Sequence, residues 1–593
     1  MRFILIFLFI FASVNASTQL VPIIVKAKKE KPVQAWQFIE SQTNEHSTIP
    51  GFEEQQLRNL PGVATSTTGN PGQTTTISIQ GAASRYTKMM WNGLNIVEAE
   101  ADASLMPLYA GKIEVIKGVH CAEYGNGAIG GIVNLLPFTM PKNQNGSARL
   151  TMGNYVQGFH AWWQQKSGRF ALQQHITADK FIGKNSIPKR YQDKYPTELK
   201  PQTVKQSFLN QLQYENHHAK AALQLGLIKS NSTASNIYNP KPCDSREKKS
   251  LQIYALDMES KSEIVQPYLK VLSAKFYMQD FSPYQNNGRY GTYENTKTRL
   301  GVKLKKESIV FEPLVECNNS TYKNREYKNT SMFNKRSGEY AFAQGLHLYK
   351  NSITWKNWLR FHKSERLKTI HAFSSSLLLR NGDTEYSAHF GTGFCIPDLF
   401  KLYNISQGGN PNLKNEKAIG GNFGIAQKTN IGTFNVLLFK TEYEQQITWK
   451  DNKFINLNKS RQQGFEVGWK NKVGAWGTHI SSLYTESVEL SPRKALLNVP
   501  KFIANGRIFY EKDDFCTSIG CRYTGLQNQS DFESGKPVEK GDYPVFYGDM
   551  QYKLTQNTTW QIAVENVLAR TIESPHGYRN PGFQISTGLS IIW

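Results

Sequence analysis

The segment Phe546-Tyr-Gly-Asp-Met-Gln-Tyr-Lys-Leu554 shows how most of this chain is built. Successive side chains of an extended strand point to opposite faces, so Phe546, Met550 and Leu554 share one face. The other face carries Tyr547, Asp549, Gln551 and Lys553. One apolar, aromatic face and one polar face are typical of a strand between lipid and a water-filled lumen.

The same alternation recurs along the chain. Trp560, Ile562 and Val564 alternate with polar or small residues, and the stretches 299–304 and 583–593 repeat the pattern. A soluble β-sandwich or propeller also alternates, but it does not account for an aromatic final residue that follows alternating apolar positions. The pattern therefore favours a membrane barrel.

The lengths of the connections support this interpretation. The turns near 306–308 and 555–558 are short, whereas the connections near 527–543 and 569–582 are long. Short turns on one side and long loops on the other are typical of outer-membrane barrels. We predict a membrane all-β fold, an antiparallel transmembrane β-barrel of about 22 strands over residues 141–593.

Composition excludes a helical transporter. The 593 residues are 39% hydrophobic, and the mean hydropathy is −0.50. The apolar stretch Phe3–Ala12 is too short for a transmembrane helix, which needs about 20 residues. Arg2, this stretch and the small residues Val14-Asn-Ala16 instead predict a signal peptide over residues 1–16.

Export would bring the six cysteines into an oxidising compartment. They show no CxxC spacing, and the sequence does not determine whether any of them pair. Cys516 and Cys521 lie five residues apart in a predicted strand, so they face opposite sides and are not expected to join.

The formal net charge is +23. The chain has no basic helix, zinc-finger spacing or RNA-binding aromatic signature, so we do not expect it to bind nucleic acid. An exported protein meets lipid phosphates and anionic ligands, and the charge indicates such surroundings.

Residues 57–137 do not follow the barrel pattern. They contain Leu-Arg-Asn-Leu-Pro-Gly-Val (57–63), Thr-Ile-Ser-Ile-Gln-Gly (76–81), Trp-Asn-Gly (91–93), Lys-Ile-Glu-Val-Ile-Lys-Gly (112–118) and Tyr-Gly-Asn-Gly-Ala-Ile-Gly-Gly-Ile-Val-Asn (124–134). The alternating Ile113 and Val115, with Val119, are expected to form a small core, and the glycines allow close approach of backbones.

In order and spacing, these motifs resemble the plug domain of TonB-dependent outer-membrane receptors. Segments near 394–416 and 463–466 also resemble that family's barrel motifs. The resemblance implies an N-terminal α/β plug domain, residues 33–140, inside the barrel lumen. Where the family has an Arg and an Asp in the plug, this chain has Gln80 and Asn92. The loss of both charges is mutually consistent if the two side chains meet.

The hydrophobic run Val21-Pro22-Ile23-Ile24-Val25-Lys26-Ala27, within a leader at 17–32, is similar to the family's TonB box. Such a segment suits the addition of a strand to a partner's sheet edge. The resemblance implies a TonB-type energy-coupling protein of the inner membrane as partner. A short plug strand or an unstructured leader is the alternative.

We find no GxSxG, HExxH or paired Cys/His spacing, so we expect neither an enzyme nor a resident metal or cofactor. The resemblance implies a monomeric importer in the bacterial outer membrane for a scarce metal chelate, vitamin B12 (cobalamin) or a ferric siderophore. A haem receptor is less favoured, because no His lies between Cys395 and Leu413. A passive porin or an adhesin is the other alternative.

Two segments are predicted to contact the ligand. The plug loop would lie at the apex and offer hydroxyl, amide and backbone groups. A predicted extracellular loop near 281–296 would offer aromatic and cationic groups that suit planar or anionic chelates. The candidate residues are Ser66, Thr67, Thr68, Gly69, Asn70 and Gln73 in the first segment and Tyr284, Arg289, Tyr290 and Tyr293 in the second.

Overall fold

The computed structural model of the chain describes residues 37–40, 57–58, 60–69, 72–97, 102–106, 112–183, 202–236, 243–282, 287–326, 332–365, 367–404, 408–457, 459–531, 536–573 and 576–593. These residues belong to one compact unit, Gln34–Trp593. The predicted signal peptide, the segment Val21–Ala27, Asn70 and Tyr284 lie outside the described residues. None of the helices in the described ranges is long and apolar enough to cross a membrane.

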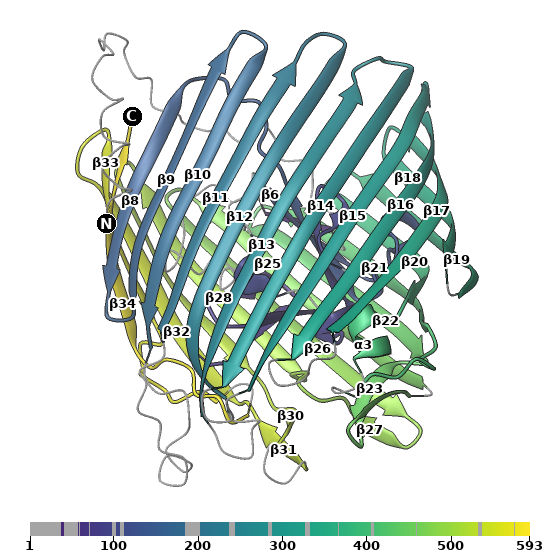
Figure 1. The fold of residues 1–593 in the computed structure, drawn as a ribbon. Helices are drawn as coiled ribbons and strands as arrows, with labels where there is room; N and C mark the ends of the chain where they lie inside the picture. The colour runs from purple at the N-terminus through teal and green to yellow at the C-terminus, as the bar shows by residue number, and fades with distance from the viewer. Residues whose placement is uncertain are drawn as a thin grey trace. The chain divides into compact units, whose positions relative to one another are not determined.

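Within the described residues, 22 antiparallel strands close into a barrel, as predicted (Figure 1). Each strand pairs with the next along the chain, and the last strand pairs with the first. The barrel strands are β8 (Asn145–Gly153), β9 (Val156–Ser167), β10 (Phe170–Ile182), β11 (Gln202–Glu215), β12 (Ala219–Asn236), β13 (Cys243–Ser260), β14 (Val265–Ser282), β15 (Asn287–Lys306), β16 (Ile309–Glu326), β17 (Met332–Lys350), β18 (Ile353–Ser364), β19 (Leu367–Asn381), β20 (Thr384–Cys395), β21 (Glu416–Thr429), β22 (Gly432–Glu444), β25 (Lys459–Val473), β26 (Trp476–Leu490), β28 (Phe502–Lys512), β29 (Phe515–Thr524), β32 (Tyr543–Lys553), β33 (Thr558–Glu565) and β34 (Gln584–Ile592).

The two faces of the barrel wall differ as the alternation predicts. Phe546 is 41% exposed on the outside, whereas its neighbour Tyr547 is 4% exposed on the inside. Leu300 is likewise 53% exposed beside the buried Arg299. Apolar side chains therefore cover the outer wall, and polar side chains line the lumen.

The two ends of the barrel also differ. Short turns such as Gly168–Arg169 and Glu307–Ser308 join the strands at one end. The other end, at the bottom of Figure 1, carries helix α3 (Leu399–Tyr403) and further short strands, and we call it the loop end. These strands are β23 (Ile447–Lys450), β24 (Lys453–Asn456), β27 (Arg493–Ala495), β30 (Gln527–Ser530) and β31 (Pro537–Lys540).

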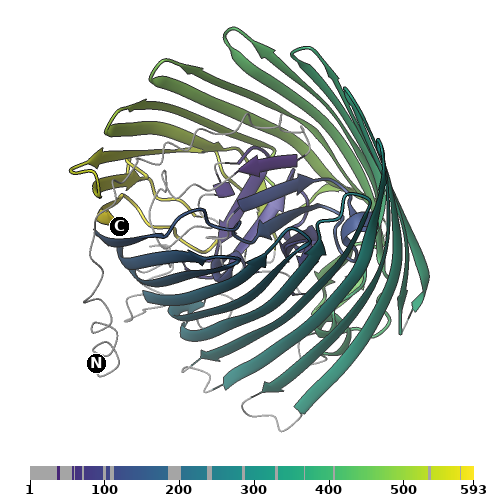
Figure 2. The same cartoon turned by 90° about the horizontal axis from the view of Figure 1, so that it is seen from above.

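Residues 57–136 with β1, which we call the plug, lie inside the ring of strands (Figure 2). A five-stranded sheet has the order β1-β6-β7-β4-β5, in which only β4 and β7 are parallel. A separate hairpin joins β2 to β3. The elements are β1 (Gln37–Glu40), β2 (Val63–Thr67), β3 (Thr75–Ile79), η3 (Ser84–Tyr86), β4 (Thr87–Trp91), β5 (Leu94–Asn95), η4 (Ala103–Leu105), β6 (Lys112–Lys117), α1 (Cys121–Tyr124) and β7 (Gly131–Leu136).

The plug has a hydrophobic core that continues into the barrel wall. Ile113, Val115 and Val119 are buried, as expected. Ile113 and Val115 belong to one apolar cluster with Leu251 and Ile253 on the inner face of β13. Burial of apolar surface therefore stabilises the plug in place as well as the plug fold itself.

Candidate functional site

The predicted apex segment forms the turn of the β2–β3 hairpin. Thr67 lies opposite Thr75, and their hydroxyl oxygens are 3.0 Å apart. The Thr68 amide donates to the Thr74 carbonyl oxygen at 3.0 Å. Thr67, Gly69 and Gln73 are buried, so Ser66 and Thr68 are the more accessible of the described candidates.

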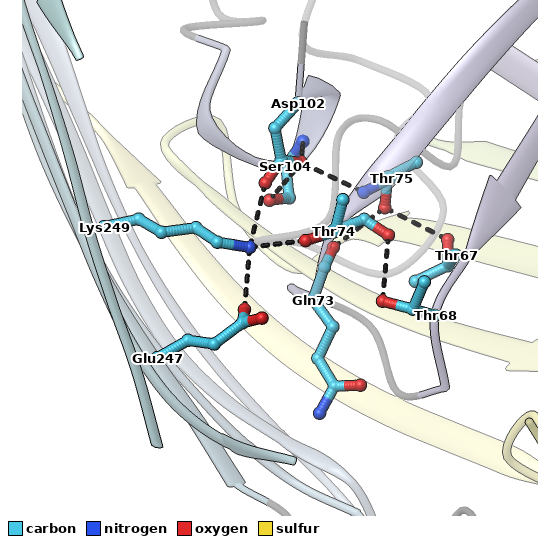
Figure 3. A network of polar contacts seen from close by, with 9 residues as sticks. All are labelled: Thr67, Thr68, Gln73, Thr74, Thr75, Asp102, Ser104, Glu247 and Lys249. Carbon is cyan, nitrogen blue, oxygen red and sulfur yellow. Dashed lines mark hydrogen bonds and ion pairs between the residues drawn. The ribbon is translucent and has the colours of Figure 1, made fainter. Parts of the chain in front are cut away.

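A buried ion-pair network ties this turn to the barrel wall (Figure 3). Lys249 of β13 contacts Asp102 at 3.1 Å and Glu247 at 2.7 Å, and it donates to the Thr74 hydroxyl. Asp102 also accepts the Thr75 amide at 2.9 Å. Buried charges with several partners lie in fixed positions, so the apex is held rigidly against β13.

The second predicted segment is largely strand and not loop, so that prediction was wrong. β15 begins at Asn287, which places Arg289, Tyr290 and Tyr293 within it. Alternation puts Tyr290 and Tyr293 on opposite faces. Tyr293 points into the lumen with Asn295, whose amide reaches the plug, whereas Tyr290 lies on the outer wall.

Tyr293 belongs to a run of aromatic rings along the lumen wall at the loop end. It stacks on Tyr322 at 4.4 Å and lies 6.1 Å from Phe276, between ring centroids. Tyr322 lies 5.8 Å from Phe333, which lies 5.8 Å from Tyr403 of α3. We call these five residues the aromatic wall.

A cation completes the aromatic wall. The ammonium of Lys335 lies 5.4 Å from the ring centroid of Tyr403 and 6.0 Å from that of Phe333. Lys335 is exposed, and both rings are half-buried. This end of the aromatic wall therefore offers ring faces and a positive charge to a ligand.

On the other side of the lumen, the carboxylate of Glu466 holds the plug. It forms an ion pair with Lys117 and accepts a hydrogen bond from the Gln80 amide at 2.9 Å. A side chain at Gly62, where φ is +73°, would clash with this carboxylate. Alternation and spacing did not predict this pair, although the motifs at 112–118 and 463–466 contain both members.

A second carboxylate, Glu416 of β21, clamps the plug close by. It accepts a hydrogen bond from the Tyr86 hydroxyl at 2.5 Å, and the Arg85 guanidinium lies 3.5 Å away. Burial, reinforced by the Glu416 charge, raises the pKa of Tyr86 well above its usual value, so the hydroxyl keeps its proton and donates.

A third buried carboxylate, Glu316, positions two arginines that contact the carboxyl end of helix α1. Glu316 lies 2.6 Å from the Arg360 guanidinium and also pairs with Arg299. The two arginines in turn donate to the carbonyl oxygens of Ala122 and Glu123 in α1. The Glu316 carboxylate thus compensates the charge of the two arginines within the wall, and the arginines still bind the carboxyl end of α1.

Gln80 and Asn92 do not meet, so a contact between them does not explain why both positions carry neutral amides. The Gln80 carbonyl accepts from Gln462 at 2.7 Å, on β25. Asn92 donates to Asp257 at 2.7 Å and accepts from Lys270, on β13 and β14. Each amide therefore contacts its own part of the wall.

A cavity of about 1160 Å³ lies beside Asn92, between the plug and strands β11–β18, near the short turns. Asn92 and Tyr124 line it from the plug, Phe138 lines it from the segment that follows β7, and Tyr268 and Glu312 are among the wall residues. The plug therefore leaves part of the lumen open on this side, near the short turns.

Within the described part of the chain, no three His, Cys, Asp or Glu side chains are grouped so that they could hold a metal ion. Among the cysteines that the structure describes, Cys121, Cys317, Cys395, Cys516 and Cys521 are not joined in disulfide bonds. Cys516 and Cys521 are not joined, as expected.

We predict that Lys117→Met weakens the hold on the plug by about 3–5 kcal/mol, because it leaves the buried Glu466 carboxylate without its cation. The measurement is the urea concentration at which trypsin begins to cleave the plug in detergent-solubilised protein. Lys472→Met is the control, because it breaks the exposed Lys472–Glu511 pair and should cost about 0–1 kcal/mol. Equal midpoints for the two variants would contradict the role of Glu466.

Comparisons with known proteins agree with this architecture. The family model for the TonB-dependent Receptor Plug Domain matches residues 54–132, and the model described as TonB dependent receptor-like, beta-barrel matches residues 363–567. The vitamin B12 transporter BtuB of Vibrio vulnificus (strain YJ016) is 22% identical over 549 residues, which cover 88% of this chain and 85% of that protein.

Solved structures show the same fold. A mutant of the ferric enterobactin receptor PfeA from Pseudomonas aeruginosa has a TM-score of 0.80 at 13% identity, and the copper transporter OprC has 0.80 at 14%. For both, the match covers 94% of this chain and 98% of the other. The siderophore receptor PirA from Acinetobacter baumannii has a TM-score of 0.76 at 14% identity, with the same coverage.

The plug, the 22-strand barrel that encloses it and the two family models lead to one conclusion. This chain belongs to the TonB-dependent receptors of the outer membrane, which are transporters and not enzymes.

Proposed function

We propose that this receptor imports a bulky metal chelate, with a ferric siderophore as the first candidate and cobalamin as the second. The observation that carries the proposal is the aromatic wall at the loop end of the lumen, which ends in Lys335. Ring faces stack with planar chelating groups, and an ammonium attracts their negative charge.

The relatives support both candidates. Two of the similar structures are described as a ferric enterobactin receptor and a siderophore receptor, which supports the first candidate. The similarity to a vitamin B12 transporter over most of the chain supports the second. A passive pore is not proposed, because the plug occupies the lumen and three buried carboxylates take part in its contacts with the wall.

Binding would begin at the loop end. The ligand would contact the aromatic wall together with the apex candidates, Ser66, Thr68 and their neighbours. The apex is held by Lys249 against β13, so it presents its hydroxyl and backbone groups in one arrangement. A preorganised site loses less entropy on binding than a mobile one.

Transport would need the plug to move. Membership of the family implies coupling to TonB, and we propose Val21–Ala27, in the leader 17–32, as the segment that TonB binds. Force on this leader would act on the plug, residues 33–140, within the barrel, 141–593. The cavity beside Asn92 lies on the side where the plug leaves space, so we propose it as the start of the exit path.

The ligand class can be tested by binding to purified full-length receptor. We expect Lys335→Ala to weaken binding of ferric enterobactin, used as an anionic aromatic probe, about 3- to 10-fold, since a cation near a ring and an anion contributes roughly 1 kcal/mol. Isothermal titration calorimetry measures the affinity, and Lys494→Ala, an exposed lysine on β27, is the control. Tight binding of cyanocobalamin with no binding of the ferric probe would favour the second candidate.

Energy coupling needs a different experiment. Deletion of Val21–Ala27 should abolish cellular uptake of whichever probe binds and leave its affinity for the purified receptor unchanged, because the segment would contact TonB and not the ligand. Uptake of the radiolabelled probe by cells of a receptor-deletion strain measures the first effect. Unchanged uptake would contradict the assignment of the TonB box.

A further inference from the structure

The outer wall of β12–β18 carries an excess of positive charge near the loop end. Among the residues whose side chains the structure describes, two carboxylates, Glu294 and Glu365, share this face near the loop end. The exposed basic residues there are Lys229, Arg246, Lys248, Lys275, Lys323, Arg325, Arg336 and Lys363, which we call the basic belt. Import through the lumen does not explain these residues, because they point away from it.

The basic belt lies directly beside the apolar part of the wall. On β14, the outward residues Leu269 and Val271 are followed at the next outward positions by Ser273 and Lys275. On β17, the exposed Phe342 and Tyr340 are followed in the same direction by Gly338 and Arg336. Four residues of strand span about 13 Å, so the charges lie just beyond the hydrocarbon layer.

The centre of the basic belt has several cations around one carboxylate. Glu294 lies 2.9 Å from Lys275 and 3.8 Å from Lys323. In the strand register, Lys275 is opposite Glu294, Glu294 is opposite Thr321, and Thr321 is opposite Arg336. Four neighbouring strands therefore place three cations around a single negative charge.

The opposite part of the wall shows that such an excess is not a general feature of this barrel. There Lys440 pairs with Glu442, and Lys459 pairs with Glu444, both at 3.0 Å. On β22 and β25 the outward cations Lys440, Lys459 and Arg461 stand beside two carboxylates, Glu442 and Glu444, so the excess there is one charge. The larger excess of positive charge thus lies on the side of β12–β18.

We propose that the basic belt binds the phosphate groups of lipids in the outer leaflet. The long-loop end of such barrels faces the outside, so the belt lies at the level of the outer headgroups. Lipid phosphates form a dense layer of fixed negative charge there, and lysine and arginine near a membrane surface are attracted to it.

The position of the basic belt explains why a lipid and not a soluble anion is the expected partner. The belt continues the lipid-facing wall, and its side chains project sideways into the membrane plane. A soluble ligand on its way to the plug would meet the lumen face instead, where Lys335 and Lys249 point. The positive charge of the chain is therefore divided between the outer wall and the lumen face.

The test is native mass spectrometry of the full-length receptor with lipid A, which carries two phosphates, and with its dephosphorylated form. In the triple variant Lys275→Gln, Lys323→Gln, Arg336→Gln, we expect lipid A affinity to fall on the order of 100-fold, from the attraction per basic residue. Glu294→Gln should tighten binding, because it removes the carboxylate that competes with phosphate. Heat-shifted gel mobility checks that every variant is folded.

The matched control is Lys440→Gln, Lys459→Gln, Arg461→Gln on β22 and β25, where two carboxylates already compensate most of the charge, and it should change the affinity less than about threefold. Equal losses in the two triple variants would overturn the proposal, since they would indicate nonspecific charge attraction. Equal binding of the dephosphorylated lipid would also overturn it, since phosphate would then play no part.

Discussion

A buried carboxylate that needs a partner determines how this molecule is assembled. Glu466 lies on the inner face of the barrel, where it is almost fully buried. An isolated charge in such a place is strongly unfavourable, and Lys117 and Gln80 of the plug compensate for it. Barrel and plug are therefore each incomplete without the other at this point. Gly62 is part of the same constraint, because a larger residue would displace the carboxylate.

The surroundings of the plug also differ between the two sides of the lumen. Glu416 and Glu466, with Gln462 nearby, bind the plug on the side of β21–β25, where hydrogen bonds and ion pairs are dense. On the side of β11–β18, the hairpin tip at Asn92 reaches the wall next to a large cavity. Lys249, Arg299 and Arg360 hold the plug on this side as well, so the cavity beside Asn92 is the space into which the plug can move locally without leaving the barrel. This is the physical basis of the exit path that we propose.

Much of the fold could be predicted because its signals are local. The alternation from Phe546 to Leu554 reflects one wall with lipid on one side and a polar lumen on the other, and the structure confirms it. The contacts between plug and wall could not be predicted from spacing, because Gln80 and Glu466 are 386 residues apart. The polar and aromatic residues near 281–296 predict a loop, which would contain Tyr290 and Tyr293. The strands continue beyond the apolar part of the wall. In that part of a strand both faces are polar, so polar residues there do not indicate a loop.

The central claim is that the plug closes the barrel until energy from TonB moves it. The most direct measurement is the conductance of the purified full-length receptor in a planar lipid bilayer, without TonB. The structure predicts no stable open channel in the native receptor. It predicts a large steady conductance once urea weakens the contacts of the plug, which open at a lower free energy than the strand hydrogen bonds of the barrel. A steady open channel in the native receptor without urea would contradict the account.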